Sequence, residues 1–354
     1  MASSHSPYTV SGLSASFEEV IAFIQAQEAR LVARDPRLQA VRPSHKVRAA
    51  LMLQPSERHA SSLAVFDAQK QLRGYVAPDI WQLPKDSLLH AFLTERNGIA
   101  QSLTLPNPAD RDVRDVTSMV LSALSASWQR AGSTGDLIRW PSHDTDWLEP
   151  ILLEHGFLLD SICALRPLSA PSLAPRVAHR TAQIREAHPS DEEALLNLFE
   201  EELRVHARCI PFARVSLAAI HGFRRRLARL WDGETLEEGA PLVLIAERGQ
   251  NIVGMAECLL CHVSPDEEPG FTPPGHYGCL DNVCVAESAR GQGIGTLLTQ
   301  AALAAFEPLP DLKGYILWYS PGNVLAAHFW PHAGFEPLWT TFQRLPHMRE
   351  ALHL

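Results

Sequence analysis

The stretch that decides the fold runs from residue 283 to residue 296 as Val-Cys-Val-Ala-Glu-Ser-Ala-Arg-Gly-Gln-Gly-Ile-Gly-Thr. An apolar, strand-like segment ends, an arginine follows, and the Ala- and Leu-rich run from Leu297 to Phe306 predicts a helix. Glycine permits unusual backbone angles and lets a ligand approach the backbone closely. Because the N-terminus of a helix is electropositive, this Gly-rich loop predicts a binding site for a phosphate or a diphosphate.

Three kinds of loop compete for this stretch. The dinucleotide fingerprint needs Gly-x-Gly-x-x-Gly, whereas the glycines here are spaced Gly-x-Gly-x-Gly. The ATP-type loop needs a lysine before Ser or Thr, and Gly295-Thr296 lacks it. Arg290, Gly293 and Gly295 do fit Arg-x-x-Gly-x-Gly, which resembles the acetyl-coenzyme A loop of the GNAT superfamily of acetyltransferases. On its own, the pattern also allows a plain strand-to-helix connection.

The flanking segments favour the GNAT interpretation. Residues 314–319 predict a buried strand, and the following residues match the spacing Asn-x-x-Ala-x-x-Phe, then Gly-Phe, at Asn323, Ala326, Phe329 and Gly334-Phe335. This is similar to the second half of the GNAT signature, a helix beside the pantetheine arm that ends at a glycine cap. Upstream, strands are predicted at 182–187, 242–248 and 251–257. The order of elements implies the GNAT fold over residues 181–346.

Length and composition set the outer limits. A chain of 354 residues fits two domains, and no run approaches the ~20 apolar residues of a membrane helix. The net charge of −9 argues against a nucleic-acid partner. No export signal is visible at the N-terminus, and the six cysteines then indicate reduced thiols rather than disulfides or a metal site. We therefore expect a cytoplasmic protein without membrane or metal partners, as a monomer or homodimer.

The chain resembles an internal duplication. Residues 135–166 match residues 313–344 at a constant offset, with Gly156-Phe157 and Gly334-Phe335 lying 178 positions apart. We predict an α/β protein with two tandem GNAT-like domains, each a mixed central sheet flanked by helices. The expected domains are residues 1–166 and 181–354, joined by a Pro-, Ser- and Ala-rich linker at 167–180. This plan resembles that of mycothiol synthase-like tandem GNAT proteins.

The two copies differ at the loop. In the first copy the stretch 105–116 has no glycine and contains three aspartates, Asp110, Asp112 and Asp115. Carboxylates beside a diphosphate repel it, and side chains block the close approach of the backbone. We predict that residues 1–166 keep the fold but bind no acetyl-coenzyme A. They either help to shape the substrate cleft or serve only as a stability partner.

The resemblance implies direct transfer of an acetyl group from acetyl-coenzyme A to an amine. Backbone N–H groups of the loop would bind the diphosphate, and the strand at 283–285 should splay from its neighbour and bond the pantetheine arm. An N–H of Val285 or Cys284 would polarise the thioester carbonyl. The implied cofactor-binding residues are Val283, Cys284, Val285, Arg290, Gly291, Gln292, Gly293, Ile294, Gly295, Thr296, Asn323, Ala326 and Phe329.

The proton-transfer groups are less well marked. Many GNAT enzymes protonate the departing thiolate with a tyrosine, but this position is Trp330, which cannot act as an acid. Tyr319, a histidine of the following helix, or water would replace it. Glu257 and Asp281 lie on the two strands that flank the acceptor site in the family, so each is a candidate base and each also fits a purely structural role. The predicted catalytic residues are Glu257, Asp281 and Tyr319.

The acceptor itself is not marked by a motif. A small-molecule amine is the leading expectation; the alternatives are a protein or peptide N-acetyltransferase and a non-catalytic acyl-coenzyme A-binding protein. The basic run 224–226 is interpreted as a solvated helix face more readily than as a site for an acidic acceptor. The long insertion at 265–274 is a candidate lid.

Overall fold

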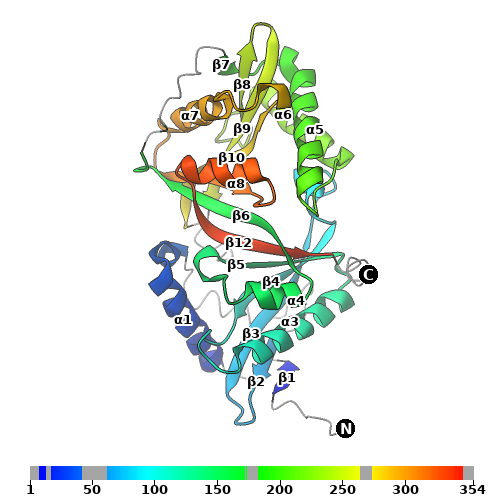
Figure 1. The fold of residues 1–354 in the computed structure, drawn as a ribbon, viewed down its shortest axis with the longest axis vertical. Helices are drawn as coiled ribbons and strands as arrows, with labels where there is room; N and C mark the ends of the chain where they lie inside the picture. Colours follow the sequence, from blue (N-terminus) through cyan, green and yellow to red (C-terminus); the bar gives the residue numbers. More distant parts are fainter. Residues whose placement is uncertain are drawn as a thin grey trace.

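The computed structural model describes residues 8–12, 17–41, 62–171, 173, 182–263 and 273–345. Most of the predicted linker and the predicted lid therefore lie outside the described residues. A single sheet of twelve strands passes through the whole molecule, with helices packed against it (Figure 1). The predicted α/β class, with a mixed central sheet flanked by helices, is confirmed. None of the helices in the described ranges has the length and apolar character that crossing a membrane requires.

The two halves of the chain repeat one order of elements. The main elements of the first half are β1 (Thr9–Gly12), α1 (Phe17–Arg34), β2 (Leu63–Phe66), β3 (Leu72–Gln82), η2 (Leu88–Ala91), β4 (Arg96–Thr104), α3 (Val113–Arg130), β5 (Gly135–Pro141), α4 (Glu149–Glu154) and β6 (Leu158–Pro167). Those of the second half are β7 (Gln183–Glu186), α5 (Glu192–Cys209), α6 (Leu217–Trp231), β8 (Leu242–Arg248), β9 (Asn251–Val263), β10 (Gly275–Val285), η6 (Glu287–Ala289), α7 (Ile294–Phe306), β11 (Leu312–Tyr319), α8 (Val324–His332) and β12 (Glu336–Arg344).

The halves exchange their last strands. The strand order is β1-β2-β3-β4-β5-β12-β6-β11-β10-β9-β8-β7, so β12 lies beside β5 of the first half and β6 lies beside β11 of the second. β6 and β12 pair antiparallel with each other at the centre, where Figure 1 shows them side by side. The two cores are therefore joined through continuous backbone hydrogen bonding rather than through a surface contact alone.

The strand that carries the predicted site separates from one neighbour. β10 pairs with β9 along almost its whole length, with a bulge between Leu280 and Asn282. With β11 it pairs only from His276 to Cys279. The backbone groups of β10 beyond Cys279 therefore have no strand partner on the β11 side among the described residues. The expected splay of this strand is confirmed.

The sheet of the second half is covered on both faces. Alternate residues of a strand point to opposite faces, and the strands β8 and β9 follow this rule. Val243, Ile245 and Met255 pack with residues of α5 and α6, whereas Leu244 and Ala256 pack with residues of α7 and α8. The amphipathic helices thus form two separate layers, and the splayed end of β10 opens between them.

The first half also packs directly on helices of the second. The backbone N–H of Arg214 donates to the carbonyl of Ala91 over 2.8 Å. At Gly222 of α6 a Cβ atom would lie 2.4 Å from the carbonyl oxygen of Asp86, so only glycine allows this approach. Gln343 of β12 donates to the carbonyl of Phe92 over 3.2 Å. The segment around η2 is therefore seated on α6 and beside α5.

Candidate functional site

The Gly-rich loop takes the shape that an anion site requires. Gly291 and Gly293 have φ values of 74° and 81°, a left-handed conformation that strains any other residue. Gly293 is the N-cap of α7, so the N–H groups of Ile294, Gly295 and Thr296 have no partner inside the helix. These groups and the helix dipole face one place, where negative charge is favoured.

The loop, the splayed strand and α8 meet around Gly295. A Cβ atom at Gly295 would lie 3.9 Å from both Phe329 Cζ and Val285 Cγ2. Val283, Val285, Ala326 and Phe329 are partly buried against one hydrophobic cluster. The structure thus brings together residues that are distant in the sequence but that were predicted to share one ligand. Asn323 has a different position, since its side chain caps α8 by accepting from the N–H of Ala326 over 3.3 Å.

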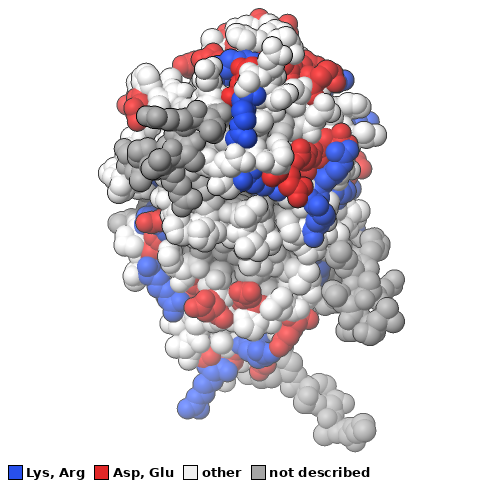
Figure 2. All heavy atoms as spheres, turned by 45° about the horizontal axis from the view of Figure 1, so that its top comes forward, with Lys and Arg blue, Asp and Glu red and all other residues white. Residues whose placement is uncertain are grey.

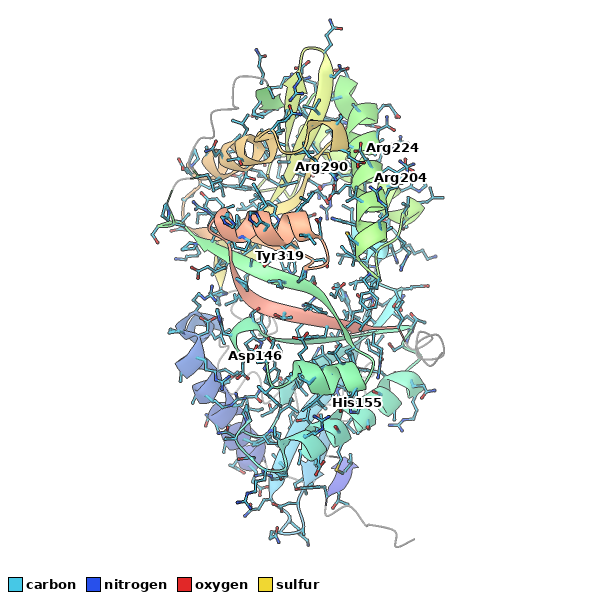
Figure 3. The ribbon with its side chains drawn as sticks, in the orientation of Figure 1. Asp146, His155, Arg204, Arg224, Arg290 and Tyr319 are labelled. Atoms are coloured by element: carbon cyan, nitrogen blue, oxygen red, sulfur yellow. The ribbon has the colours of Figure 1, made fainter. Side chains whose placement is uncertain are left out.

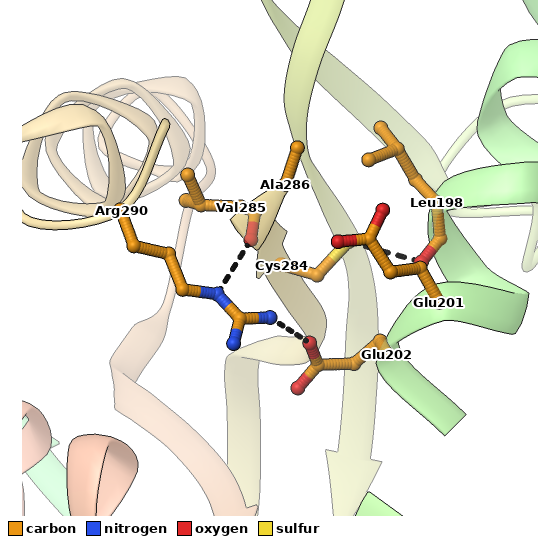
Figure 4. A pocket seen from close by; sticks show the side chains of 7 residues that line it. All are labelled: Leu198, Glu201, Glu202, Cys284, Val285, Ala286 and Arg290. Carbon is orange, nitrogen blue, oxygen red and sulfur yellow. Dashed lines mark hydrogen bonds and ion pairs between the residues drawn. The ribbon is translucent and has the colours of Figure 1, made fainter. Parts of the chain in front are cut away.

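Arg290 reaches back to the splayed strand. Figure 3 labels Arg290 in the whole molecule. Its Nε donates to the carbonyl oxygen of Val285 over 2.9 Å, and its Nη2 lies 3.5 Å from Oε2 of Glu202 on α5 (Figure 4). A small pocket here is lined by Leu198, Glu201, Glu202, Cys284, Val285, Ala286 and Arg290. Glu202 is not predictable from the sequence, because it is one of three consecutive glutamates, residues 200–202, which resemble the polar face of a helix.

The two candidate bases lie together on one guanidinium. Nη1 of Arg226, on α6, is 3.0 Å from Oε1 of Glu257 and also contacts a carboxylate oxygen of Asp281. The side-chain amide of Asn282 donates to the other oxygen of Glu257. Glu257 is completely buried, whereas the Asp281 side chain is 29% exposed. Of this pair, only Asp281 is therefore accessible to solvent.

Arg226 corrects the interpretation of the basic run as a solvated helix face. Arg224 and Arg225 are exposed and pair with surface carboxylates, but Arg226 is half-buried between two carboxylates. The sequence does contain a signal for the partial burial of Arg226. Phe223 and Leu227 are buried, and Arg226 borders the same face of α6.

The surroundings shift the protonation of Glu257. Burial raises the pKa of Glu257 to about 7, the positive charge of Arg226 opposes this shift, and the charge of Asp281 adds to it. Two carboxylates share one guanidinium, so the cluster carries an excess negative charge whenever both are ionised. Such a cluster attracts a cationic group.

The remaining candidates occupy packed positions. Tyr319 ends β11 with 8% exposure, and burial raises the pKa of its phenol (Figure 3). Trp330 packs edge-on against Phe329 and Phe335, at ring distances of 4.8 and 5.4 Å. Cys284 lies in the core below α5, and burial raises the pKa of its thiol well above the usual range. Its environment is that of a packed core thiol rather than of a nucleophile.

The corresponding stretch of the first half is filled with its own ion pairs. Nη2 of Arg73 lies 2.9 Å from Asp110 and 2.8 Å from Asp112, and the hydroxyl of Tyr8 donates to Asp112 over 2.8 Å. Two of the three aspartates of this stretch are thus paired within the first half. Among the described residues no cluster of side chains is suited to holding a metal ion.

Comparisons with known proteins agree with this geometry. Residues 195–335 match the family model described as Acetyltransferase (GNAT) family. A GCN5-related N-acetyltransferase from Sphaerobacter thermophilus superposes with a TM-score of 0.52 at 14% identity, covering 96% of each chain. No curated protein matches the chain.

Two further solved structures are more distant. A GCN5-related glucosamine N-acetyltransferase region of a fungal multi-domain β-N-acetylglucosaminidase gives a TM-score of 0.49 at 14% identity, over 97% of this chain and 39% of that one. A tandem GNAT protein from the clavulanic acid biosynthesis pathway gives 0.44 at 13%, over 95% and 98%. The family match covers the loop, the splayed strand and α8, and the match to the Sphaerobacter protein extends over the repeated fold. Residues 195–335 thus match the GNAT family of acetyltransferases, and the elements of this part of the chain have counterparts in the first half.

Proposed function

We propose that residues 181–354 form an acetyl-coenzyme A-dependent N-acetyltransferase that acts directly on an amine of a small molecule. Residues 1–166 are proposed as a domain without a cofactor loop, joined by the linker 167–180. One observation carries the proposal: the free edge of β10 leads straight into the loop at the N-terminus of α7. A ligand with a peptide-like arm and a diphosphate needs these two features in this order.

The residues present fit such a cofactor. The N–H groups from Gln292 to Thr296 would bind the diphosphate, and the backbone of Val283–Val285 would bond the arm. Gly295 has no side chain, and a Cβ atom there would lie 3.9 Å from both Val285 and Phe329. The space between these two residues is therefore left for the arm. When bound, acetyl-coenzyme A supplies an activated acetyl group; the protein orients it and handles the protons.

Asp281 is proposed as the base that removes a proton from the acceptor amine. It is the partly exposed carboxylate of the cluster, and Arg226 and the buried Glu257 fix its position and supply the surrounding charge. The excess negative charge favours an acceptor that arrives as a cation. Tyr319 is proposed as the acid for the departing thiolate, and its raised pKa keeps the phenol protonated at neutral pH.

The acceptor is proposed to be small because the first half closes on the acceptor side. The segment around η2 packs on α5 and α6 and reduces the access of a folded chain from that direction. On the face drawn in Figure 2, acidic and basic side chains lie intermixed over the second half. A cytoplasmic location is also proposed, supported by six cysteines that form no disulfide.

The cofactor site is tested by calorimetry with coenzyme A. Gly295→Leu places a side chain between Val285 and Phe329 without straining the backbone, so binding should fall beyond detection. Ala304→Leu adds the same side chain to an exposed position of α7 and should bind like wild type. If the wild-type protein binds no coenzyme A, the proposal is wrong.

The reaction is tested by release of free thiol from acetyl-coenzyme A with a panel of amines and peptides. Turnover with small amines supports the proposed acceptor class, whereas turnover with peptides alone supports the protein or peptide alternative. Tight cofactor binding without turnover on any amine or peptide would point to a non-catalytic binding protein.

A further inference from the structure

The carbonyl of Val285 belongs to the free edge of β10. The N–H of the next residue, Ala286, donates to Val253 of β9 over 2.9 Å. Since the polar groups of successive strand residues point to opposite edges, those of Val285 point away from β9, toward the splayed opening. This oxygen is already occupied, because Arg290 Nε donates to it over 2.9 Å (Figure 4).

Glu202 holds the arginine in this position. Its Oε2 lies 3.5 Å from Arg290 Nη2, and its Oε1 lies 2.9 Å from Nε2 of His206. The ring of His206 contacts Phe92 of the first half, with 5.5 Å between the ring centroids. Arg290 and Glu202 are 24% and 17% exposed, so the contact is only partly screened by solvent. A line of contacts thus runs from the first half to the free edge of β10.

The first half contains a fixed version of the same arrangement. Gln27 and Glu202 are each the eleventh residue of an 18-residue helix, α1 and α5 respectively. The Gln27 amide donates to the carbonyl of Leu103 over 2.9 Å and accepts from the N–H of Leu105 over 2.8 Å. Both groups lie where β4 has already parted from β5, whose pairing ends at Ile99.

The carbonyl of one residue and the N–H two residues later are the groups that a parallel neighbouring strand would bond. In the first half a side-chain amide takes that place directly. In the second half the residue at the same helix position contacts Arg290, and Arg290 in turn bonds the strand.

We propose that Glu202 is a positioning residue that holds the Arg290 guanidinium on the Val285 carbonyl, and that this contact opens before a peptide-like arm pairs with β10. The inference rests on the proposed function, because the arm is the pantetheine of coenzyme A. A site that is open for only part of the time binds more weakly by that fraction. Loosening the contact should therefore strengthen the binding of a ligand that carries the arm.

The test compares coenzyme A with 3′-phosphoadenosine 5′-diphosphate, which has the nucleotide and the diphosphate but lacks the arm. Both are titrated calorimetrically into the full chain, as wild type and as Glu202→Gln. Removing a negative charge strengthens the binding of both ligands. The ratio of the two affinities therefore measures the effect on the arm alone. We expect Glu202→Gln to tighten coenzyme A about 2- to 5-fold relative to the nucleotide.

The matched control is Glu200→Gln. It removes the same charge from α5, but Glu200 pairs with Arg204 rather than with Arg290. It should leave the ratio unchanged. An unchanged ratio in Glu202→Gln, or a selective weakening of coenzyme A, overturns the inference while leaving the proposed function intact. If the wild-type protein binds neither ligand, the proposed function itself is wrong.

Discussion

Asp281 occupies the extra position of the bulge in β10. A bulge turns one side chain out of the regular alternation, and here it lets Asp281 face Arg226 on the same side as Glu257. The two carboxylates therefore share one guanidinium but differ in exposure: Glu257 is buried, and Asp281 is partly open to solvent.

Asp281→Asn should lower kcat/KM for the acceptor roughly 100-fold or more, because a positioned base contributes about that much. The affinity for coenzyme A should stay within about twofold of wild type. Steady-state kinetics and calorimetry measure the two effects separately. The control is Asp146→Asn, an exposed carboxylate in the first half. Full activity in Asp281→Asn would remove Asp281 from the mechanism.

Arg226→Gln should destabilise the fold by about 1 to 3 kcal/mol, because it leaves Glu257 buried without its cation. Breaking a fully buried pair costs more, but Arg226 is 29% exposed and solvent screens part of the interaction. Urea unfolding gives the free energy directly. Arg224→Gln, on the exposed face of the same helix, should change it by less than about 0.5 kcal/mol. Equal effects in both variants would contradict the buried-cluster argument.

Glu257 should also give the stability a specific pH dependence. Its folded-state pKa, about 7, lies above the ordinary value of 4.5, so the folded protein binds the proton more tightly than the unfolded chain. Its contribution is fully present below about pH 4.5 and is lost as the pH rises to about 7. Unfolding free energies measured from pH 4.5 to 8 should therefore show a downward component that Glu257→Gln removes. The same slope in that variant would assign the effect to another group.

At the scale of elements, the approach of α6 to the η2 segment depends on one glycine. A Cβ at Gly222 would lie 2.4 Å from a backbone oxygen, which no side-chain rotation relieves. Gly222→Leu should therefore destabilise the protein by about 1 to 3 kcal/mol. Thermal or urea unfolding measures this, and Ala228→Leu on the exposed side of α6 is the control. A neutral Gly222→Leu would show that the two segments separate freely.

Local elements could be predicted from the sequence because their signals are local. The Gly-rich loop needs positive φ at Gly291 and Gly293, and only glycine adopts it freely, so the loop and the helix after it were marked by residue type. The turn between β8 and β9 was marked in the same way at Gly249, whose φ is 64°.

Contacts between distant elements could not be predicted in this way. Arg226 resembles its exposed neighbour Arg225, and Glu202 resembles the adjacent Glu201; only packing decides which guanidinium meets Glu257 and which carboxylate meets Arg290. Strand exchange is equally invisible, because β6 and β12 carry the same residues and form the same kinds of backbone hydrogen bonds whichever half they join.

At the scale of the whole molecule, the exchanged strands make each half depend on the other. In the isolated segment 181–354, β11 would lose β6, and β12 would lose both β5 and β6. Unpaired strand edges of this length associate with other chains. We expect this segment alone to aggregate or self-associate, as measured by light scattering after size exclusion. Co-expression with residues 1–180 should restore a one-to-one complex. A stable monomer of 181–354 would contradict this view.

The central pair of β6 and β12 also has an evolutionary consequence. Two identical subunits that traded their last strands would build this same sheet about a two-fold axis. In such a dimer both subunits carry every substitution. A substitution that destroys the binding loop therefore abolishes both binding sites at once. With both copies on one chain, a substitution occurs once. One copy is then free to bond its splayed strand with Gln27 and to form its own ion pairs, while the other keeps the Gly-rich loop.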